Sequence, residues 1–122
     1  MNKFLFFFSG LFFFLFRISN AADVARLEKK TISVGTGSVI QANDEVEISY
    51  TLWINDKKIE TKKNFRLKLE EKKIIPGLYQ AIVGSKKGDK IIFNVPPELG
   101  YGARAEGEVP PNSNLKYELE IK

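Results

Sequence analysis

The chain has 122 residues, a length that suits one domain with a hydrophobic core of its own. It contains neither cysteine nor histidine, which excludes disulfides, thiol nucleophiles, histidine-based catalysis and zinc sites built from these residues. Lysine and arginine outnumber aspartate and glutamate by 19 to 15, but the lysine pairs are scattered among acids, so nucleic-acid binding is not expected.

The start of the chain has the pattern of a secretory signal peptide. Lys3 supplies the charged beginning, and eight of the ten phenylalanines lie in the apolar run 4–16 that follows it. These thirteen residues fall short of the roughly 20 that a membrane-spanning helix needs. The small residues Ser19 and Ala21 favour cleavage before Ala22.

We therefore expect residues 1–21 to be a cleaved leader and residues 22–122 to be the mature domain, with a net charge of +2. This predicts an exported protein of the bacterial periplasm, the extracellular space or a eukaryotic secretory compartment, with no stable membrane insertion after cleavage. An uncleaved membrane anchor is the alternative.

The mature part predicts a series of short strands separated by turns. Apolar and polar residues alternate in most of these segments, which is typical of strands with one buried face. The turn signal at Asn55 and Asp56 suggests that 57–60 pairs back as a hairpin arm. The expected strands are 31–34, 46–54, 65–69, 91–95 and 115–121.

A single short helix is expected after Pro76 and Gly77. Leu78, Ala81 and Ile82 follow at helical spacing, and Gly84 is a suitable stop. A helix of about two turns needs a sheet to pack against. The fold class is therefore α+β, a curved antiparallel sheet of five or six strands wrapped around one short helix.

A loop bracketed by two Pro-Pro pairs, 96–111, precedes the last strand. Such a loop is a connector or the wall of a binding site. Ile74 and Ile75 lie at a bend and could present a backbone N–H, while inward-facing aromatic residues such as Tyr50 could line the same hollow. Plain core is the alternative for each of these residues.

Six segments, in order, resemble FKBP-type peptidyl-prolyl cis-trans isomerases over most of the mature length. The most specific are the last three, since PPELGYG is followed closely by VPPNSNL. The segments are VGTG at 34–37, DEVEISYTL at 44–52, NFRLKL at 64–69, KIIPGLYQAIVGSKKGDK at 73–90, VPPELGYG at 95–102 and VPPNSNLKYELEI at 109–121.

The resemblance implies an FKBP-like fold and a proline-binding pocket that needs no cofactor or metal. In such a pocket the backbone N–H of Ile75 and the hydroxyl of Tyr101 would bind carbonyl groups of the substrate, with Val109 on the rim. The walls would come from Tyr50, Phe65, Ile74, Ile75 and Tyr117.

Several positions depart from the pattern of the family. Leu78 stands where a tryptophan is usual, Ile59 and Glu60 stand where the family has a phenylalanine-aspartate pair, and Leu52 replaces a glycine. The resemblance thus implies a pocket that is less aromatic than usual, with slow-to-moderate activity.

The expected function is isomerisation of X-Pro bonds in exported client proteins, as folding assistance by a monomer. The alternative is an FKBP-like module or chaperone that binds proline-containing or unfolded chains with little catalysis. Binding without acceleration of prolyl exchange would distinguish the module from the enzyme.

Overall fold

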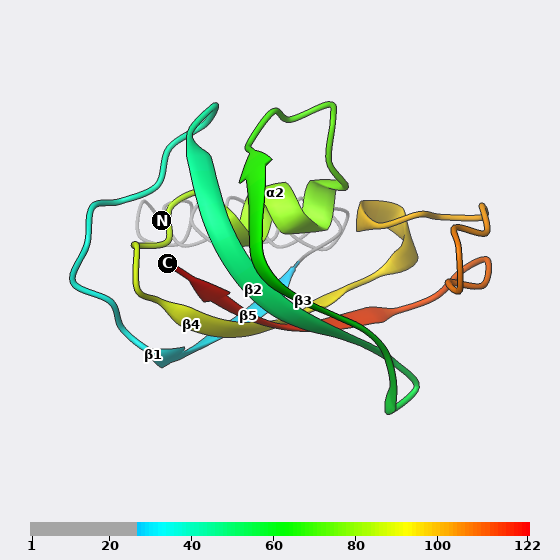
Figure 1. Ribbon diagram of the computed structural model, residues 1–122. Helices are drawn as coiled ribbons and strands as arrows, with labels where there is room; N and C mark the ends of the chain where they lie inside the picture. Colours follow the sequence, from blue (N-terminus) through cyan, green and yellow to red (C-terminus); the bar gives the residue numbers. More distant parts are fainter. Residues whose placement is uncertain (1–26) are drawn as a thin grey trace, which may run out of the picture.

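The computed structural model describes residues 27–122, so the predicted leader lies outside the described residues. No helix in this described part has the length and hydropathy needed to cross a bilayer. Within residues 27–122 five strands and one α-helix make up the fold, which confirms the α+β class (Figure 1). The elements are β1 (Glu28–Ser33), β2 (Glu45–Ile54), β3 (Lys57–Lys68), α2 (Pro76–Ile82), β4 (Lys90–Val95), the 3-10 turn η1 (Pro97–Leu99) and β5 (Leu115–Ile121).

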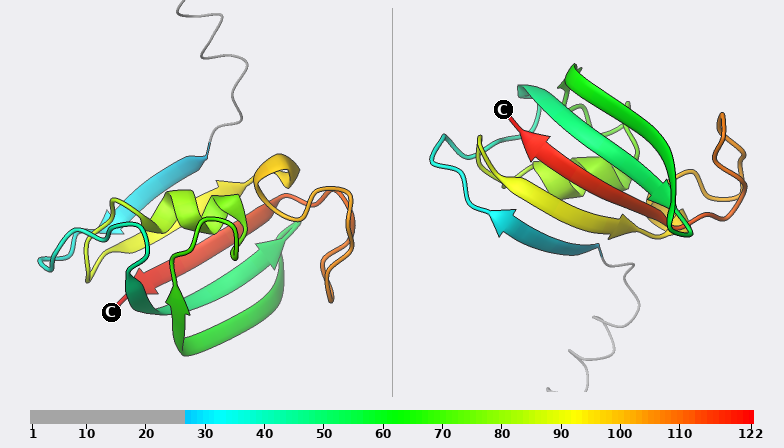
Figure 2. Two further views of the ribbon diagram at one scale, coloured as in Figure 1. Left: turned by 90° about the horizontal axis from the view of Figure 1, so that it is seen from above. Right: turned by 60° about the horizontal axis from the view of Figure 1, so that its bottom comes forward.

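The strands form one sheet in the order β1-β4-β5-β2-β3, and every neighbouring pair is antiparallel. The sheet curves, and α2 lies across its concave side (Figures 1 and 2). The last strand along the chain, β5, is thus the central strand.

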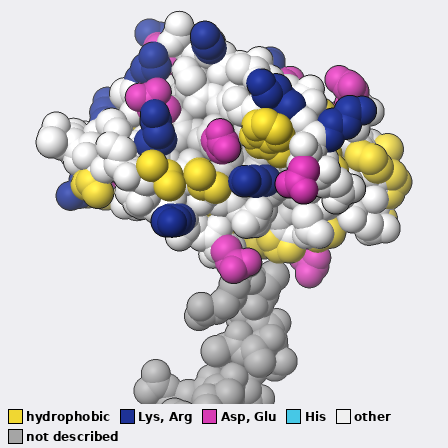
Figure 3. All heavy atoms as spheres, turned by 90° about the horizontal axis from the view of Figure 1, so that it is seen from below, with side chains coloured by type: hydrophobic (Ala, Val, Ile, Leu, Met, Phe, Trp, Pro, Cys, Tyr) yellow, Lys and Arg dark blue, Asp and Glu magenta, His cyan; other side chains and the backbone are white. Residues whose placement is uncertain are grey.

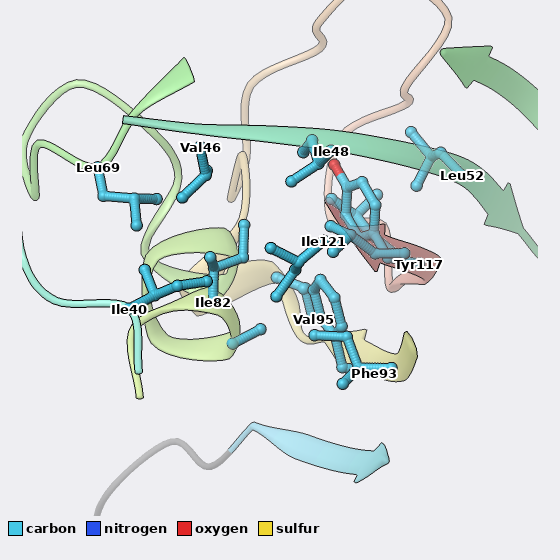
Figure 4. Packing of buried hydrophobic residues seen from close by; sticks show 14 of the residues in the cluster. Ile40, Val46, Ile48, Leu52, Leu69, Ile82, Phe93, Val95, Tyr117 and Ile121 are labelled. Atoms are coloured by element: carbon cyan, nitrogen blue, oxygen red, sulfur yellow. The ribbon is translucent and has the colours of Figure 1, made fainter. Parts of the chain in front are cut away.

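The core lies between α2 and the concave side of the sheet. Every second residue of β5 is buried, from Leu115 to Ile121, and β2 shows the same alternation. Ala81 and Ile82 of the helix are fully buried against them. Figure 4 shows these side chains converging from the strands and from α2, with Ile40 and Leu69 closing the end of the cluster.

The edge strand β1 begins earlier than the expected 31–34, and all six of its residues are exposed. Backbone pairing with β4 holds it, and one side chain ties it to the helix. The ammonium group of Lys29 donates to the carbonyl oxygen of Ala81 at 3.2 Å and to the hydroxyl of Ser85 at 3.0 Å.

The expected hairpin arm 57–60 and strand 65–69 are one continuous strand, β3. Asn55 and Asp56 form a tight turn with φ values of 50° and 64°. The pairing between β2 and β3 shifts by one residue at two places. The first shift is seen where Ile48 faces Phe65 whereas Tyr50 faces Lys62, and the second lies between Leu52 and Trp53. Each shift is a β-bulge, which bends the strand without ending it.

The outer face of the sheet carries charged side chains of both signs among isolated apolar groups (Figure 3). Arg66 on β3 pairs with Glu47 on β2 at 3.6 Å, and the ammonium group of Lys58 lies 5.6 Å from the centre of a Trp53 ring. This face fits exposure to water.

Candidate functional site

A pocket of about 760 Å³ opens on the concave side of the sheet. It lies among the β2–β3 hairpin, the start of α2 and the loop that follows η1. All ten residues expected at the site line it. They are Tyr50, Ile59, Glu60, Phe65, Ile74, Ile75, Leu78, Tyr101, Val109 and Tyr117.

One wall of the pocket is aromatic and continuous with the core. The ring of Tyr117 stacks on buried Phe93 at 5.2 Å and meets the ring of Tyr50 edge-on at 5.5 Å. Tyr117 is 3% exposed, so the core fixes the position of this wall. Figure 4 shows Tyr117 between β5 and the neighbouring strand β2.

Phe65 is less buried than expected for an inward strand position. Its exposure is 38%, and it meets Tyr50 edge-on at 6.4 Å between ring centres. The ammonium group of Lys62 lies 4.9 Å from the centre of the Phe65 ring. Phe65 therefore forms the open side of the aromatic wall, because β3 is an edge strand with no further strand beside it.

A bulge brings two consecutive residues of β3 to the pocket. Leu52 faces Glu60 and Trp53 faces Lys58, which leaves Ile59 as the extra residue. In a regular strand neighbouring side chains point to opposite faces, whereas a bulge re-aims one of them. Ile59 and Glu60 can both line the cavity for this reason.

Tyrosine hydroxyls supply hydrogen-bonding groups in the pocket. Tyr50 donates a hydrogen bond to Oε1 of Glu60 at 2.9 Å. Burial, and then this hydrogen bond, raise the pKa of Tyr50. Burial also raises the pKa of Tyr101, with the charges of Glu106 and Glu60 adding to it. Both hydroxyls stay protonated at neutral pH and can donate hydrogen bonds.

The helix start supplies a backbone donor. Ile75 is the N-cap residue, extended at φ −63° and ψ 143°, and its carbonyl accepts from the N–H groups of Leu78 and Tyr79. Among the described residues, none accepts a hydrogen bond from the N–H of Ile75. That N–H is available to a ligand, since the first N–H groups of a helix have no partner within it.

The loop after η1 is held by its own backbone. Glu106 and Val109 exchange two hydrogen bonds, at 2.9 and 2.8 Å, and Gly107 between them has a φ of 57°. The N–H of Asn112 donates to the carbonyl of Gly102 at 2.7 Å. Val109 is only 6% exposed, so it lies deeper than the rim position expected for it.

The pocket also has lining residues that the sequence prediction missed. Leu52 shares a strand face with Tyr50, so the alternation of β2 could have identified it. The charged residues come from irregular segments, whose sequence carries no periodic signal. They are Lys72, Lys73, Arg104, Glu106 and Glu108.

Comparison with known proteins gives a consistent result. Residues 36–122 match the family model described as FKBP-type peptidyl-prolyl cis-trans isomerase. The chain is 31% identical over 111 residues to FK506-binding protein 1 of Aspergillus oryzae, covering 78% of this chain and 95% of that protein. It is 32% identical over 96 residues to a probable FKBP-type peptidyl-prolyl cis-trans isomerase of Haemophilus influenzae, covering 75% of this chain but 40% of that protein.

Solved structures agree with the sequence matches. The crystal structure of FkpA from Escherichia coli superposes with a TM-score of 0.72 at 29% identity, over 78% of this chain and 46% of that one. A peptidyl-prolyl cis-trans isomerase from Pseudomonas syringae gives a TM-score of 0.71 at 26% identity, over 78% of this chain and 72% of that one. The chain thus spans nearly all of the fungal relative but less than half of the Haemophilus protein and of FkpA.

Proposed function

Because this chain belongs to the family of FKBP-type peptidyl-prolyl cis-trans isomerases and is an isomerase of that type, we propose that the pocket beside Tyr50, Ile75 and Tyr101 is where it binds and rotates X-Pro bonds. One observation carries the proposal: the ten residues chosen from sequence, which are spread from β2 to β5, line a single cavity. The substrates of such a domain are proline-containing polypeptides.

The pocket suits this reaction because the reaction needs no acid, base or metal. Rotation about an X-Pro bond crosses a barrier of about 20 kcal/mol, since the twisted amide loses its resonance. The twisted amide is less polar than the planar one, so apolar walls favour it over the ground state. Ile59, Ile74 and Leu78 supply such walls beside the aromatic residues.

Two donors would hold the flanking peptide while the bond rotates. The N–H of Ile75 and the hydroxyl of Tyr101 both border the cavity, on separate segments of the chain. Carbonyl groups of the client on either side of the rotating X-Pro bond would accept hydrogen bonds from them. Fixing both flanks lowers the entropy that must be lost on reaching the twisted state.

The decisive experiment is NMR exchange spectroscopy on a short peptide with the core Ala-Leu-Pro-Phe. We expect the protein to accelerate cis-trans exchange, and Ile75→Lys to lower that acceleration because a charge enters an apolar wall. Ile32→Lys is the matched control, because Ile32 is 49% exposed on β1 and does not line the pocket.

No acceleration at high protein concentration would contradict the proposal. A binding titration with the same peptide, and the comparison of the two variants, distinguish two ways in which the proposal could be wrong. Binding without acceleration would indicate a proline-binding module, and equal loss of rate in the Ile75→Lys and Ile32→Lys variants would place the reaction elsewhere.

We further propose that residues 1–21 are a cleaved leader and that the clients are exported proteins. The support is the sequence pattern: a lysine, a phenylalanine-rich run and small residues before Ala22. We expect N-terminal sequencing of protein recovered from a secreting host to begin at Ala22. A chain that begins at Met1 would contradict cleavage and favour the membrane anchor.

A further inference from the structure

Apart from Glu60 on β3, the charged residues that line the pocket belong to two segments of the chain. Lys72 and Lys73 belong to the segment between β3 and α2, whereas Glu106 and Glu108 belong to the loop after η1. Figures 1 and 2 place these two segments on opposite sides of the start of α2. The mouth of the pocket therefore has a basic side and an acidic side.

The basic side keeps charge available to a ligand. Glu70 forms ion pairs with Lys73 at 3.1 Å and with Lys68 at 3.7 Å, so its carboxylate is shared by two lysines. No carboxylate among the described residues lies within ion-pair distance of Lys72. Neither Glu70 nor its neighbour Glu71 lines the cavity.

The acidic side keeps a net negative charge as well. Arg104 in the same loop also lines the pocket and offsets one of the two glutamates. Both Glu106 and Glu108 are exposed, and neither forms an ion pair among the described residues. The charge of Glu106 reaches into the cavity, since it contributes to the raised pKa of Tyr101.

A client that occupies the pocket must pass both sides. An extended peptide advances about 3.3 Å per residue, so a cavity of about 760 Å³ has room for only a few residues of a client. With the proline at the centre, the residues one to three positions away on either side lie at the mouth. Their charges then meet lysines on one side and glutamates on the other.

We propose that the pocket selects X-Pro segments with opposite charges on the two sides of the proline, an acid held by Lys72 and Lys73 and a base held by Glu106 and Glu108. This inference rests on the proposed function of the pocket. It also implies that the client chain enters in one direction, because reversing it would place like charges together.

The test compares two peptides of identical composition and opposite polarity, Ala-Glu-Leu-Pro-Phe-Lys-Ala and Ala-Lys-Leu-Pro-Phe-Glu-Ala, with acetylated and amidated ends. NMR exchange gives the catalysed rate for each after subtraction of the uncatalysed rate. We expect kcat/KM to differ about two- to five-fold, the size that exposed ion pairs allow. The difference should shrink in about 1 M salt, where charges are screened within a few ångströms.

The variant Lys72→Glu/Glu108→Lys exchanges charge across the pocket and keeps the net charge constant. We expect it to reverse the preference between the two peptides. Lys30→Glu/Glu118→Lys is the matched control: it makes the same exchange at exposed residues that do not line the pocket, and it should keep the original preference.

Equal rates for the two peptides in the unaltered protein would overturn this inference, and so would an unreversed preference in the Lys72→Glu/Glu108→Lys variant. The uncharged Ala-Leu-Pro-Phe peptide separates this failure from failure of the proposed function. If that peptide is accelerated while polarity has no effect, the pocket is catalytic but indifferent to charge.

Discussion

Tyr101 is half-buried in the loop between η1 and β5, and its hydroxyl has no protein hydrogen-bond partner among the described residues. The neighbouring backbone fixes its position, since the N–H of Arg104 donates to its carbonyl at 3.1 Å. A donor held at the edge of an apolar cavity gains strength from the low local dielectric.

We expect Tyr101→Phe to lower kcat/KM for a prolyl peptide by about two- to ten-fold, the worth of one net hydrogen bond. The ring and its packing remain, so stability should change little. NMR exchange measures the rate, and thermal unfolding checks the fold. Tyr79→Phe is the control, because Tyr79 does not line the pocket, and an unchanged rate in Tyr101→Phe would remove the hydroxyl from the mechanism.

Some of the residues that line the pocket could be predicted from the sequence, and others could not. The family resemblance selected all ten, including Ile59, Glu60 and Leu78, which depart from the family pattern. Strand alternation could have added Leu52. The positions of Lys72 and Glu108 beside the cavity depend on how two irregular segments fold, which no local pattern encodes. The depth of Val109 depends likewise on the hydrogen-bonded turn with Glu106.

At the scale of elements, α2 approaches β4 very closely at one point. A Cβ atom added to Gly77 would lie 2.5 Å from Cγ1 and 2.6 Å from Cγ2 of Val95. Gly77 is required here for space, and it sets the position of the helix start that carries the N–H of Ile75. The glycine thus links core packing to the pocket.

We expect Gly77→Ala to lower the free energy of unfolding by about 1–3 kcal/mol, because overpacking outweighs the better helix propensity of alanine. Adding Val95→Ala should relieve the clash, so the double variant should lose less stability than the sum of the two single variants. Urea unfolding of all three variants measures this coupling. Strictly additive losses would show that the side chain of Val95 does not limit the approach.

Asp89 connects two loops at the end of β1 and the start of β4. It is 6% exposed and accepts hydrogen bonds from the N–H of Gly35 at 2.7 Å and the N–H of Lys86 at 2.9 Å. These bonds, that to Lys86 first, lower the pKa of Asp89 below its ordinary value of 3.8. The carboxylate therefore stabilises the fold above about pH 4, and this contribution is lost as the pH falls through the lowered pKa.

We expect Asp89→Ala to cost about 1–3 kcal/mol of unfolding free energy at pH 7, because two backbone donors lose their acceptor. The gap between the variant and the unaltered protein should narrow as the pH falls below 4. Urea unfolding at several pH values measures both effects, with Glu120→Ala on the outer face as the control for loss of charge. A gap that does not change with pH would contradict a role for the ionised carboxylate.

The strands were predicted best where they lie inside the sheet. β2, β4 and β5 have neighbours on both sides and one face on the core, so their residues alternate between buried and exposed. The edge strands β1 and β3 are exposed over nearly their whole length, so apolar and polar residues alternate over only part of each strand. Their bounds were wrong for that reason, including the break expected within β3.

For the whole molecule, the sequence predicted the fold class because it contains several segments of alternating apolar and polar residues and one helical segment. The order of the strands did not follow, because neighbours in the sheet are distant in the sequence: β1 pairs with β4, and β2 pairs with β5. Turn signals identify only the adjacent pair β2 and β3. Long-range pairing depends on how the whole core is buried.

The central position of β5 has a consequence for the way the chain is made. Its seven residues separate β4 from β2, so the two halves of the sheet share no strand pairing until Leu115–Ile121 is in place. A chain synthesised from its N-terminus therefore remains open until this segment has been added. A message truncated before codon 115 would encode a polypeptide that lacks the central strand. We expect proteases to degrade this polypeptide.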